Sequence, residues 1–247
     1  MLAKIKIHFE ERPYVGKTFR PRPEIFIDES SQLLIVATPW GARSAAKKVI
    51  ERMTEYLSLA REDNEATSPF ERLSCISTQA NNLRIAALLA NEAVYREDNV
   101  NEYRSGVEIF AAIIDENEIV WIQAGSPHIL LGRPGQRLLP LGSSIDLAFD
   151  MSDTAAGDAI LPPLPSQLLG LDSSLNLNLN SFRAHPGDRV VLLSYSHVPE
   201  VLFTTQESKT VSELSLDLIS KRLASSQPDA AFWLGILTIG EEQGSSQ

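Results

Sequence analysis

Two long tracts with helical spacing stand together in the sequence, over residues 42–61 and 69–97, and strand-like runs lie on both sides of them. In each tract apolar residues recur at intervals of three and four, which is typical of an amphipathic helix. The runs before and after the pair are organised as hairpins and do not alternate one by one with helices. This order of elements predicts an α+β fold and argues against a parallel, doubly wound sheet.

Polar or Gly/Pro turns separate the expected strands. Residues 24–38 form one hairpin around a polar turn, Pro134-Gly135 turns another, and a further helix is expected over residues 209–224. No linker is polar enough to divide the chain, so we expect one domain over residues 1–240 and a disordered tail over 241–247. The strands expected to be buried are 32–37, 107–114, 119–124, 189–194 and 230–238.

The charge balance excludes several classes of partner. The chain has 22 Lys and Arg against 32 Asp and Glu, a net charge of −10, which disfavours nucleic acid and anionic membranes. The apolar runs are too short to span a bilayer, and the N-terminus lacks the apolar core of a signal peptide. One cysteine, Cys75, fits a reducing compartment. We therefore expect a cytoplasmic protein with no nucleic-acid or membrane partner.

Several short motifs follow one another in a definite order between residues 20 and 240. They are LLIVATPWGARS with the helix after it, Ala90-Asn91, GSPHILLGRPG, Leu169-Gly170, Pro186-Gly187-Asp188 and the Asp229 that precedes the last strand. In this order and spacing the chain resembles the type 2C metal-dependent serine/threonine protein phosphatases, including their bacterial relatives of the stage II sporulation E kind. The resemblance implies a four-layer α-β-β-α sandwich, in which two antiparallel sheets pack face to face and helices lie outside.

The resemblance also implies a metal site, and here the chain departs from it. That family holds two Mg²⁺ or Mn²⁺ ions between its sheets on carboxylates, and the ions activate the water that attacks a phosphoserine or phosphothreonine. Hydroxyl residues replace three aspartates, while one acid is kept and another aligns loosely. In sequence order these degenerate metal-site positions are Glu24, Thr38, Ser126, Ser196 and Asp229. Each lost charge-assisted contact is worth about 1.5–3 kcal/mol, so we expect no metal and no catalytic residue.

The expected function is therefore a catalytically inactive, phosphatase-2C-like domain, or pseudophosphatase. It would act as a binding or regulatory module in bacterial phospho-signalling, with a phosphoprotein or a kinase as its partner and without a cofactor. The resemblance places a substrate-side arginine near the N-terminus, which would be Arg20 or Arg22. Either guanidinium is able to hold a phosphate through two hydrogen bonds, although a solvated surface arginine is the better explanation of each.

The alternative is an active metal-dependent phosphoprotein phosphatase with altered ligands. His128 and His197 align with loops near the lost site and are possible ligands together with Asp229 or Glu24. Imidazole suits zinc, iron or manganese better than magnesium, although ordinary loop histidines explain the same pattern. A serine hydrolase is disfavoured, because the adjacent Ser196 and His197 would point to opposite faces of a strand and the sequence has no Gly-x-Ser-x-Gly elbow.

Overall fold

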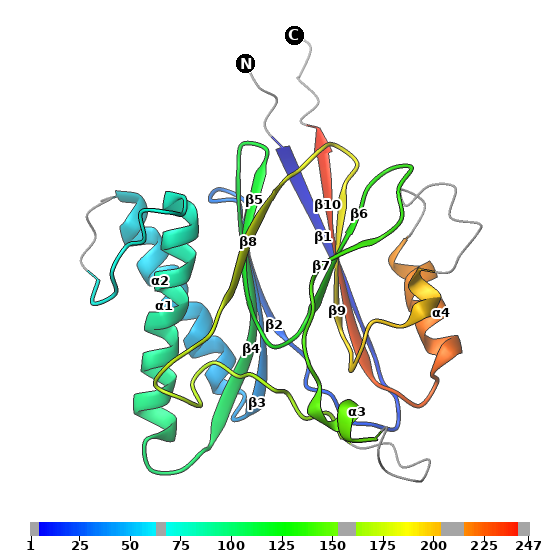
Figure 1. The fold of residues 1–247 in the computed structure, drawn as a ribbon, viewed down its shortest axis with the longest axis horizontal. Coiled ribbons are helices and arrows are strands. Elements are labelled where there is room, and N and C mark those ends of the chain that lie inside the picture. The colour runs from blue at the N-terminus through cyan, green and yellow to red at the C-terminus, as the bar shows by residue number, and fades with distance from the viewer. Residues whose placement is uncertain (1–4, 63–67, 153–161, 204–214, 242–247) are drawn as a thin grey trace. The chain divides into compact units, whose positions relative to one another are not determined.

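The computed structural model describes residues 5–62, 68–152, 162–203 and 215–241, and it divides into two compact units, each built on its own sheet (Figure 1). Unit 1 comprises residues 1–20, 126–166 and 183–247, and unit 2 comprises residues 21–125 and 167–182. The strand pairs described in both sheets are antiparallel, which confirms the predicted α+β class. One domain over residues 1–240 stays a prediction, and residues 242–247 of the expected tail lie outside the described residues.

Unit 2 is built on a five-stranded sheet, sheet B, with the strand order β2-β3-β4-β5-β8. Two long helices, α1 and α2, pack along one face of this sheet (Figure 1). The bounds of the strands are β2 Glu24–Asp28, β3 Leu33–Gly41, β4 Ser105–Asp115, β5 Glu118–Ala124 and β8 Asn178–Arg183. The bounds of the helices are α1 Ser44–Glu62 and α2 Thr78–Val94.

Alternation along the strands decides which side chains meet the helices. Leu33, Ile35 and Ala37 of β3 belong to the core cluster that also contains Met53 of α1 and Ala86 of α2. Successive strand residues point to opposite faces, so the even-numbered residues of β3 point away from the helices. These residues are buried as well, which is why the sequence of β3 is apolar without interruption from 33 to 37.

The second helix is shorter than the sequence predicted. Residues 69–77 are not helical, because Ser77 is the N-cap and its side chain accepts a hydrogen bond of 3.2 Å from the backbone N–H of Ala80. The amide of Asn81 binds both backbone groups of Leu73 and holds the preceding segment beside the helix. The C-terminal end continues as a π-helical turn, η1, over Tyr95–Asn99.

Unit 1 is built on the second five-stranded sheet, sheet A, with the strand order β1-β10-β9-β6-β7. The helix α4 lies on one face of it, where Ile219 and Leu223 join a cluster with Leu193 and Leu234. The strands are β1 Ile5–Tyr14, β6 His128–Gly132, β7 Leu139–Gly142, β9 Arg189–Ser194 and β10 Phe232–Glu241. The helical elements are α3 Leu147–Ser152, the short 3₁₀ turn η2 Glu200–Leu202 and α4 Leu216–Ser226.

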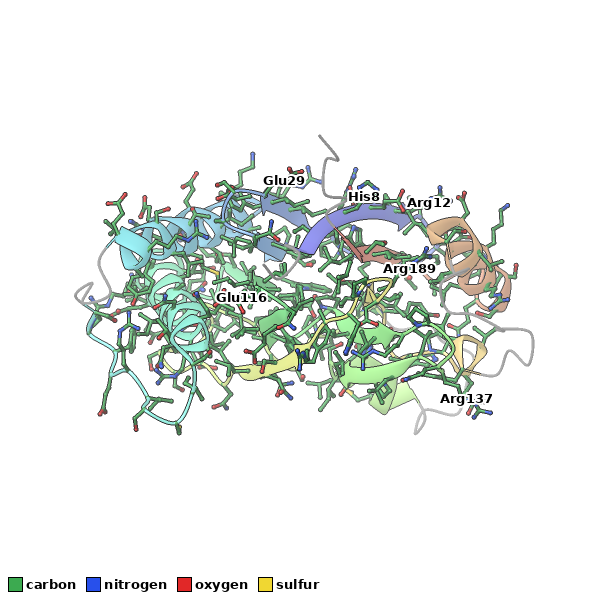
Figure 2. The ribbon with its side chains drawn as sticks, turned by 90° about the horizontal axis from the view of Figure 1, so that it is seen from above. His8, Arg12, Glu29, Glu116, Arg137 and Arg189 are labelled. Carbon is green, nitrogen blue, oxygen red and sulfur yellow. The ribbon has the colours of Figure 1, made fainter. Side chains whose placement is uncertain are left out.

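The helix expected over residues 209–224 begins at Leu216, because Ser215 is its N-cap and accepts from the N–H of Leu218. Residues 209–214 lie outside the described part of the chain. His8 and Arg12 project from β1 (Figure 2), and Arg12 forms an ion pair with Asp217 in the first turn of α4. In the described ranges no helix is both long and apolar enough to cross a membrane.

The Pro186-Gly187-Asp188 motif has a structural role in unit 1. Asp188 is fully buried and accepts hydrogen bonds from Nε and Nη2 of Arg133, the shortest at 2.9 Å. It also accepts the backbone N–H of His185 at 3.0 Å. The ion pair raises the pKa of Arg133, and it joins the end of β6 to the turn before β9.

Candidate functional site

A buried carboxylate lies directly opposite Thr38 in sheet B. Thr38 of β3 pairs with Glu108 of β4, so the two side chains leave the sheet on the same face. Both are buried, with exposed fractions of 0% and 3%. The indole Nε1 of Trp40, two residues along β3, donates a hydrogen bond of 2.9 Å to Oε2 of Glu108. Among the described residues, the buried hydroxyl of Thr38 has no hydrogen-bond partner.

The glycine at the end of β5 makes room for this carboxylate. Gly125 has a φ of +71°, and a Cβ there would lie 2.8 Å from Cγ of Glu108. Its carbonyl accepts a hydrogen bond of 2.9 Å from the buried amide of Gln123. The position of Glu108 therefore depends on a residue without a side chain at 125.

Glu24 and Arg22 also belong to unit 2. Glu24 begins β2 and pairs with Ala37, and Ala37 belongs to the cluster under the helices. Paired residues share a face, so Glu24 leaves the sheet on the helix side and Thr38 leaves it on the other. Arg22 precedes β2 and is exposed. Sheet B thus brings Thr38 together with Glu108 and not with Glu24.

Ser126 and His128 begin the second part of unit 1. The peptide bond between Ser126 and Pro127 is cis, and Ser126 is buried with its Oγ 3.5 Å from Oγ of Ser144. Nδ1 of His128 accepts a hydrogen bond of 3.2 Å from the backbone N–H of Ser144. Nε2 lies 3.1 Å from the carbonyl oxygen of Tyr195. Because Nδ1 accepts from a backbone N–H, the proton sits on Nε2, which donates to that carbonyl.

The surroundings of His128 favour the neutral imidazole. Burial lowers its pKa to about 4, and the nearby charges of Arg20 and His197 act in the same direction. Both of its ring nitrogens are engaged in hydrogen bonds within unit 1. Binding a metal through either nitrogen would first require that hydrogen bond to break.

At the polar end of the apolar strand β9, successive side chains point to opposite faces of sheet A. Ser194 is fully buried, and its hydroxyl has no hydrogen-bond partner in the part of the chain that the structure describes. Tyr195 packs on the α4 side and its hydroxyl donates to Gln227. Its ring centroid lies 5.3 Å from that of His197, whose pKa is lowered by burial. Ser196, which lies between Tyr195 and His197 in the chain, is partly exposed.

Asp229 lies just before β10 and binds residues from the segment that follows β1. Its Oδ2 is 2.8 Å from Nζ of Lys17. Its backbone carbonyl accepts the N–H groups of Lys17 and Thr18 at 2.7 and 3.2 Å. Asp229, the acid that the sequence comparison with the phosphatase family aligned most clearly, is therefore paired with the ammonium group of Lys17.

Arg20 has a buried partner of opposite charge. Nη2 of Arg20 lies 3.5 Å from Oδ2 of Asp146, and the side chains are only 5% and 7% exposed. The other oxygen of Asp146 accepts the backbone N–H groups of Ala148 and Leu164 at 3.1 and 2.9 Å. Of the two arginines proposed for phosphate binding, Arg20 is thus buried in an ion pair and Arg22 is the exposed one.

The predicted site residues divide between the units, with Glu24 and Thr38 in unit 2 and Ser126, Ser196 and Asp229 in unit 1. Within the described ranges no three His, Cys, Asp or Glu side chains are grouped so that they could hold a metal ion. The sequence interpretation missed Glu108 and Lys17. Glu108 had a detectable signal, since it is the only charged residue in the apolar run from 106 to 114.

Solved structures similar to this chain include bacterial serine/threonine phosphatases. The serine/threonine phosphatase PstP/Ppp of Mycobacterium tuberculosis has a TM-score of 0.63 and 17% identity, over 95% of this chain and 99% of that one. PppA, described as a key regulatory component of T6SS in Pseudomonas aeruginosa, has a TM-score of 0.62 and 16% identity, over 94% and 97%. The catalytic domain of PstP in complex with two manganese ions has a TM-score of 0.57 and 16% identity, over 96% and 100%.

The chain has a phosphatase-2C-like fold. At identities of 14–17% the likeness shows the fold alone, and it confirms the predicted fold class, the α-β-β-α sandwich of these phosphatases. No protein-family profile matches the sequence, and no curated protein matches it. Function must therefore be argued from the residues of the site.

Proposed function

We propose that this phosphatase-2C-like domain is a pseudophosphatase, which lacks the catalytic metal centre and acts as a binding or regulatory module in bacterial phospho-signalling. The observation that carries the proposal is the ion pair between Lys17 and Asp229. Asp229 is the one clearly aligned acid that this chain keeps, and a tethered ammonium already neutralises it. A protein with this site would bind its partner without hydrolysing a phosphate.

The side chains at the aligned positions are poor ligands for a pair of divalent metal ions. Thr38, Ser126 and Ser196 offer neutral hydroxyls, which are poor ligands for Mg²⁺ or Mn²⁺ compared with carboxylates. Two dications carry four positive charges, and confining them without several carboxylates is costly. In the proposed function no chemical step is therefore assigned to a metal or to any residue of the chain.

The proposed partner is a phosphoprotein or a kinase in the cytoplasm. Arg22 is the better candidate for phosphate binding, because its side chain is exposed whereas Arg20 is buried beside Asp146. A guanidinium forms two parallel hydrogen bonds with a phosphate, and lysine does not reproduce this geometry. Binding of a phosphoserine peptide, measured by fluorescence anisotropy, should weaken in Arg22→Lys and Arg22→Gln and should be lost with the unphosphorylated peptide.

The deciding experiment pairs calorimetric titration with Mg²⁺, Mn²⁺ and Zn²⁺ with an assay of p-nitrophenyl phosphate hydrolysis. We expect no saturable divalent binding and no turnover. The alternative, an active phosphatase with altered ligands, predicts saturable binding and turnover that Asp229→Ala abolishes. If His128 and His197 are ligands, turnover should also fall in His128→Gln and His197→Gln, and Zn²⁺ or Mn²⁺ should support it better than Mg²⁺.

A further inference from the structure

A groove runs between α1 and α2, the two helices that pack on sheet B in unit 2 (Figure 1). It has a volume of about 520 Å³, which is within the range of ligand-binding clefts. On the α1 side it is lined by Arg52, Glu55, Tyr56 and Leu59. The spacing i, i+3, i+4 and i+7 places these four side chains in one row along the helix.

The opposite wall of the groove repeats this spacing. It is formed by the end of α2 and the turn η1, with the residues Leu89, Glu92, Ala93 and Arg96. The two helices are antiparallel, because Nη2 of Arg52 in the first half of α1 lies 3.7 Å from Oε1 of Glu97, just after α2 ends. The two rows therefore run along the groove in opposite chain directions.

From the end at Arg52, both walls present the same order of chemical groups. Arginine comes first, glutamate second and leucine last, in the pairs Arg52 and Arg96, Glu55 and Glu92, and Leu59 and Leu89. Glu97 also lines the arginine end, but Nζ of Lys48 lies 3.0 Å from its Oε2 and neutralises it. At the other end Leu59 is 59% exposed. The groove thus offers two cations, two anions and an apolar surface in a fixed order.

The charges of the two walls pair with each other only at the surface. Nη1 of Arg52 lies 3.2 Å from Oε2 of Glu55, and Arg96 forms an ion pair with Glu92 one turn before it. The side chains of Arg52, Glu55 and Arg96 are well exposed. Exposed pairs of this kind contribute little to stability, so charges from a partner are able to replace them.

The hydroxyl of Tyr56 is a second observation that points to a ligand. Tyr56 lines the middle of the groove and is 5% exposed, and its hydroxyl has no hydrogen-bond partner within the described part of the chain. Buried polar groups are almost always hydrogen-bonded, so this hydroxyl calls for an explanation. An ammonium group has three N–H donors, which suffice for this hydroxyl together with the carboxylates of Glu55 and Glu92.

We propose that the groove between α1 and α2 binds an amphipathic helix of a partner protein, which presents an acidic, a basic and an apolar residue in this order from the arginine end. On a helix these residues stand at i, i+3 or i+4, and i+7, the same spacing as the walls. A second copy of this chain does not fit, because its own rows read basic, acidic, apolar and match the groove in neither direction. The inference goes beyond the proposed function, since it does not depend on whether the chain hydrolyses a phosphate.

The test measures binding of two labelled, hydrocarbon-stapled helical peptides to the full chain by fluorescence anisotropy. The first peptide carries Glu at i, Lys at i+4 and Leu at i+7 and i+8, and the second has the Glu and the Lys exchanged. Both have the same composition and net charge, so a difference between them reports the order of charges. Analytical ultracentrifugation of the chain alone measures self-association.

Four variants locate the binding surface. Glu92→Arg combined with Arg96→Glu exchanges the charges of one wall and keeps an ion pair at i, i+4. Leu59→Ser removes the apolar end, and Tyr56→Phe removes the hydroxyl. The matched control is Leu218→Ser, at an exposed leucine of α4 in unit 1. Circular dichroism establishes that each variant folds.

We expect wild type and Leu218→Ser to bind the first peptide at least about tenfold more tightly than the second. The double exchange should remove this preference, Leu59→Ser should weaken binding at least about fivefold, and Tyr56→Phe about two- to tenfold.

Equal binding of the two peptides by wild type, or binding of neither, would overturn the inference, even if a variant does not fold. A dimer that Leu59→Ser abolishes would overturn it as well, because a second copy would then occupy the groove. Mn²⁺-dependent turnover would overturn the proposed function and leave a selective response to the first peptide as support for the groove.

Discussion

Lys17 and Asp229 form an ion pair across the 2.8 Å between Nζ and Oδ2, beside a set of backbone hydrogen bonds that joins the same two segments. The side chains are 78% and 41% exposed, so the pair itself contributes little to stability. The close approach of the backbones depends on Gly16, because a Cβ there would lie 2.5 Å from the carbonyl carbon of Ala230. Backbone packing, and not the ion pair, holds this segment in place.

Gly16→Ala should therefore destabilise the protein more than Lys17→Met. We expect a cost of about 1–3 kcal/mol for Gly16→Ala, because backbone must shift to admit the methyl group. For Lys17→Met we expect less than about 1 kcal/mol. Chemical denaturation of both variants measures the difference, and a larger loss in Lys17→Met would show that the ion pair is the main contact.

Thr38→Asp should destabilise the chain while it creates a place for a divalent ion. The new carboxylate would stand opposite Glu108, and two like charges on paired residues repel each other. In the absence of metal we expect a loss of about 1–3 kcal/mol, because the pKa of one of the two acids must rise. Adding Mn²⁺ should restore more stability to Thr38→Asp than to wild type, as measured by melting temperature.

Thr38→Val is the matched control for that substitution. It keeps the shape of the side chain and removes a buried hydroxyl that has no hydrogen-bond partner among the described residues. We expect a change between zero and a gain of about 1 kcal/mol. A loss of several kcal/mol in Thr38→Val would mean that the hydroxyl makes a contact of its own in the folded protein.

His128 should make stability depend on pH between about 4 and 6.5. Its folded pKa of about 4 lies below the ordinary histidine value of 6.5, so the unfolded state binds more protons in this range. Stability is therefore complete above pH 6.5 and is lost as the pH falls toward 4, by about 3 kcal/mol in total. Urea unfolding of His128→Gln across this range should show a flatter profile than wild type. His8→Gln, at an exposed histidine, is the control and should keep the wild-type slope.

Asp188→Asn should destabilise unit 1 by about 3 kcal/mol or more, because it leaves the guanidinium of Arg133 without its buried carboxylate. Replacing both residues, as Arg133→Met with Asp188→Leu, should cost less than the sum of the single changes, because no uncompensated charge remains. Denaturant unfolding of wild type, Arg133→Met, Asp188→Leu and the double variant gives this double-mutant cycle. Additive effects would mean that the two side chains act independently.

Local patterns predicted most of the elements, and the exceptions have a common cause. The strand expected over residues 189–194 is β9, with the same bounds, because a short apolar run between polar turns has few other solutions. The start of α2 was placed about nine residues too early. Ser77 and Asn81 fix the start of the helix through hydrogen bonds with the backbone of neighbouring residues, and hydrophobic periodicity does not register such contacts.

The sequence by itself determined the α+β class, the order of the strands along the chain and the presence of hydroxyl side chains at Thr38, Ser126 and Ser196. These follow from periodicity and residue identity, which are local. Only the tertiary structure placed Glu108 opposite Thr38 and Lys17 beside Asp229. Strand register and the path of a loop join residues that are 70 and 212 positions apart in these two pairs (108 − 38 and 229 − 17), and no local pattern encodes such a distance.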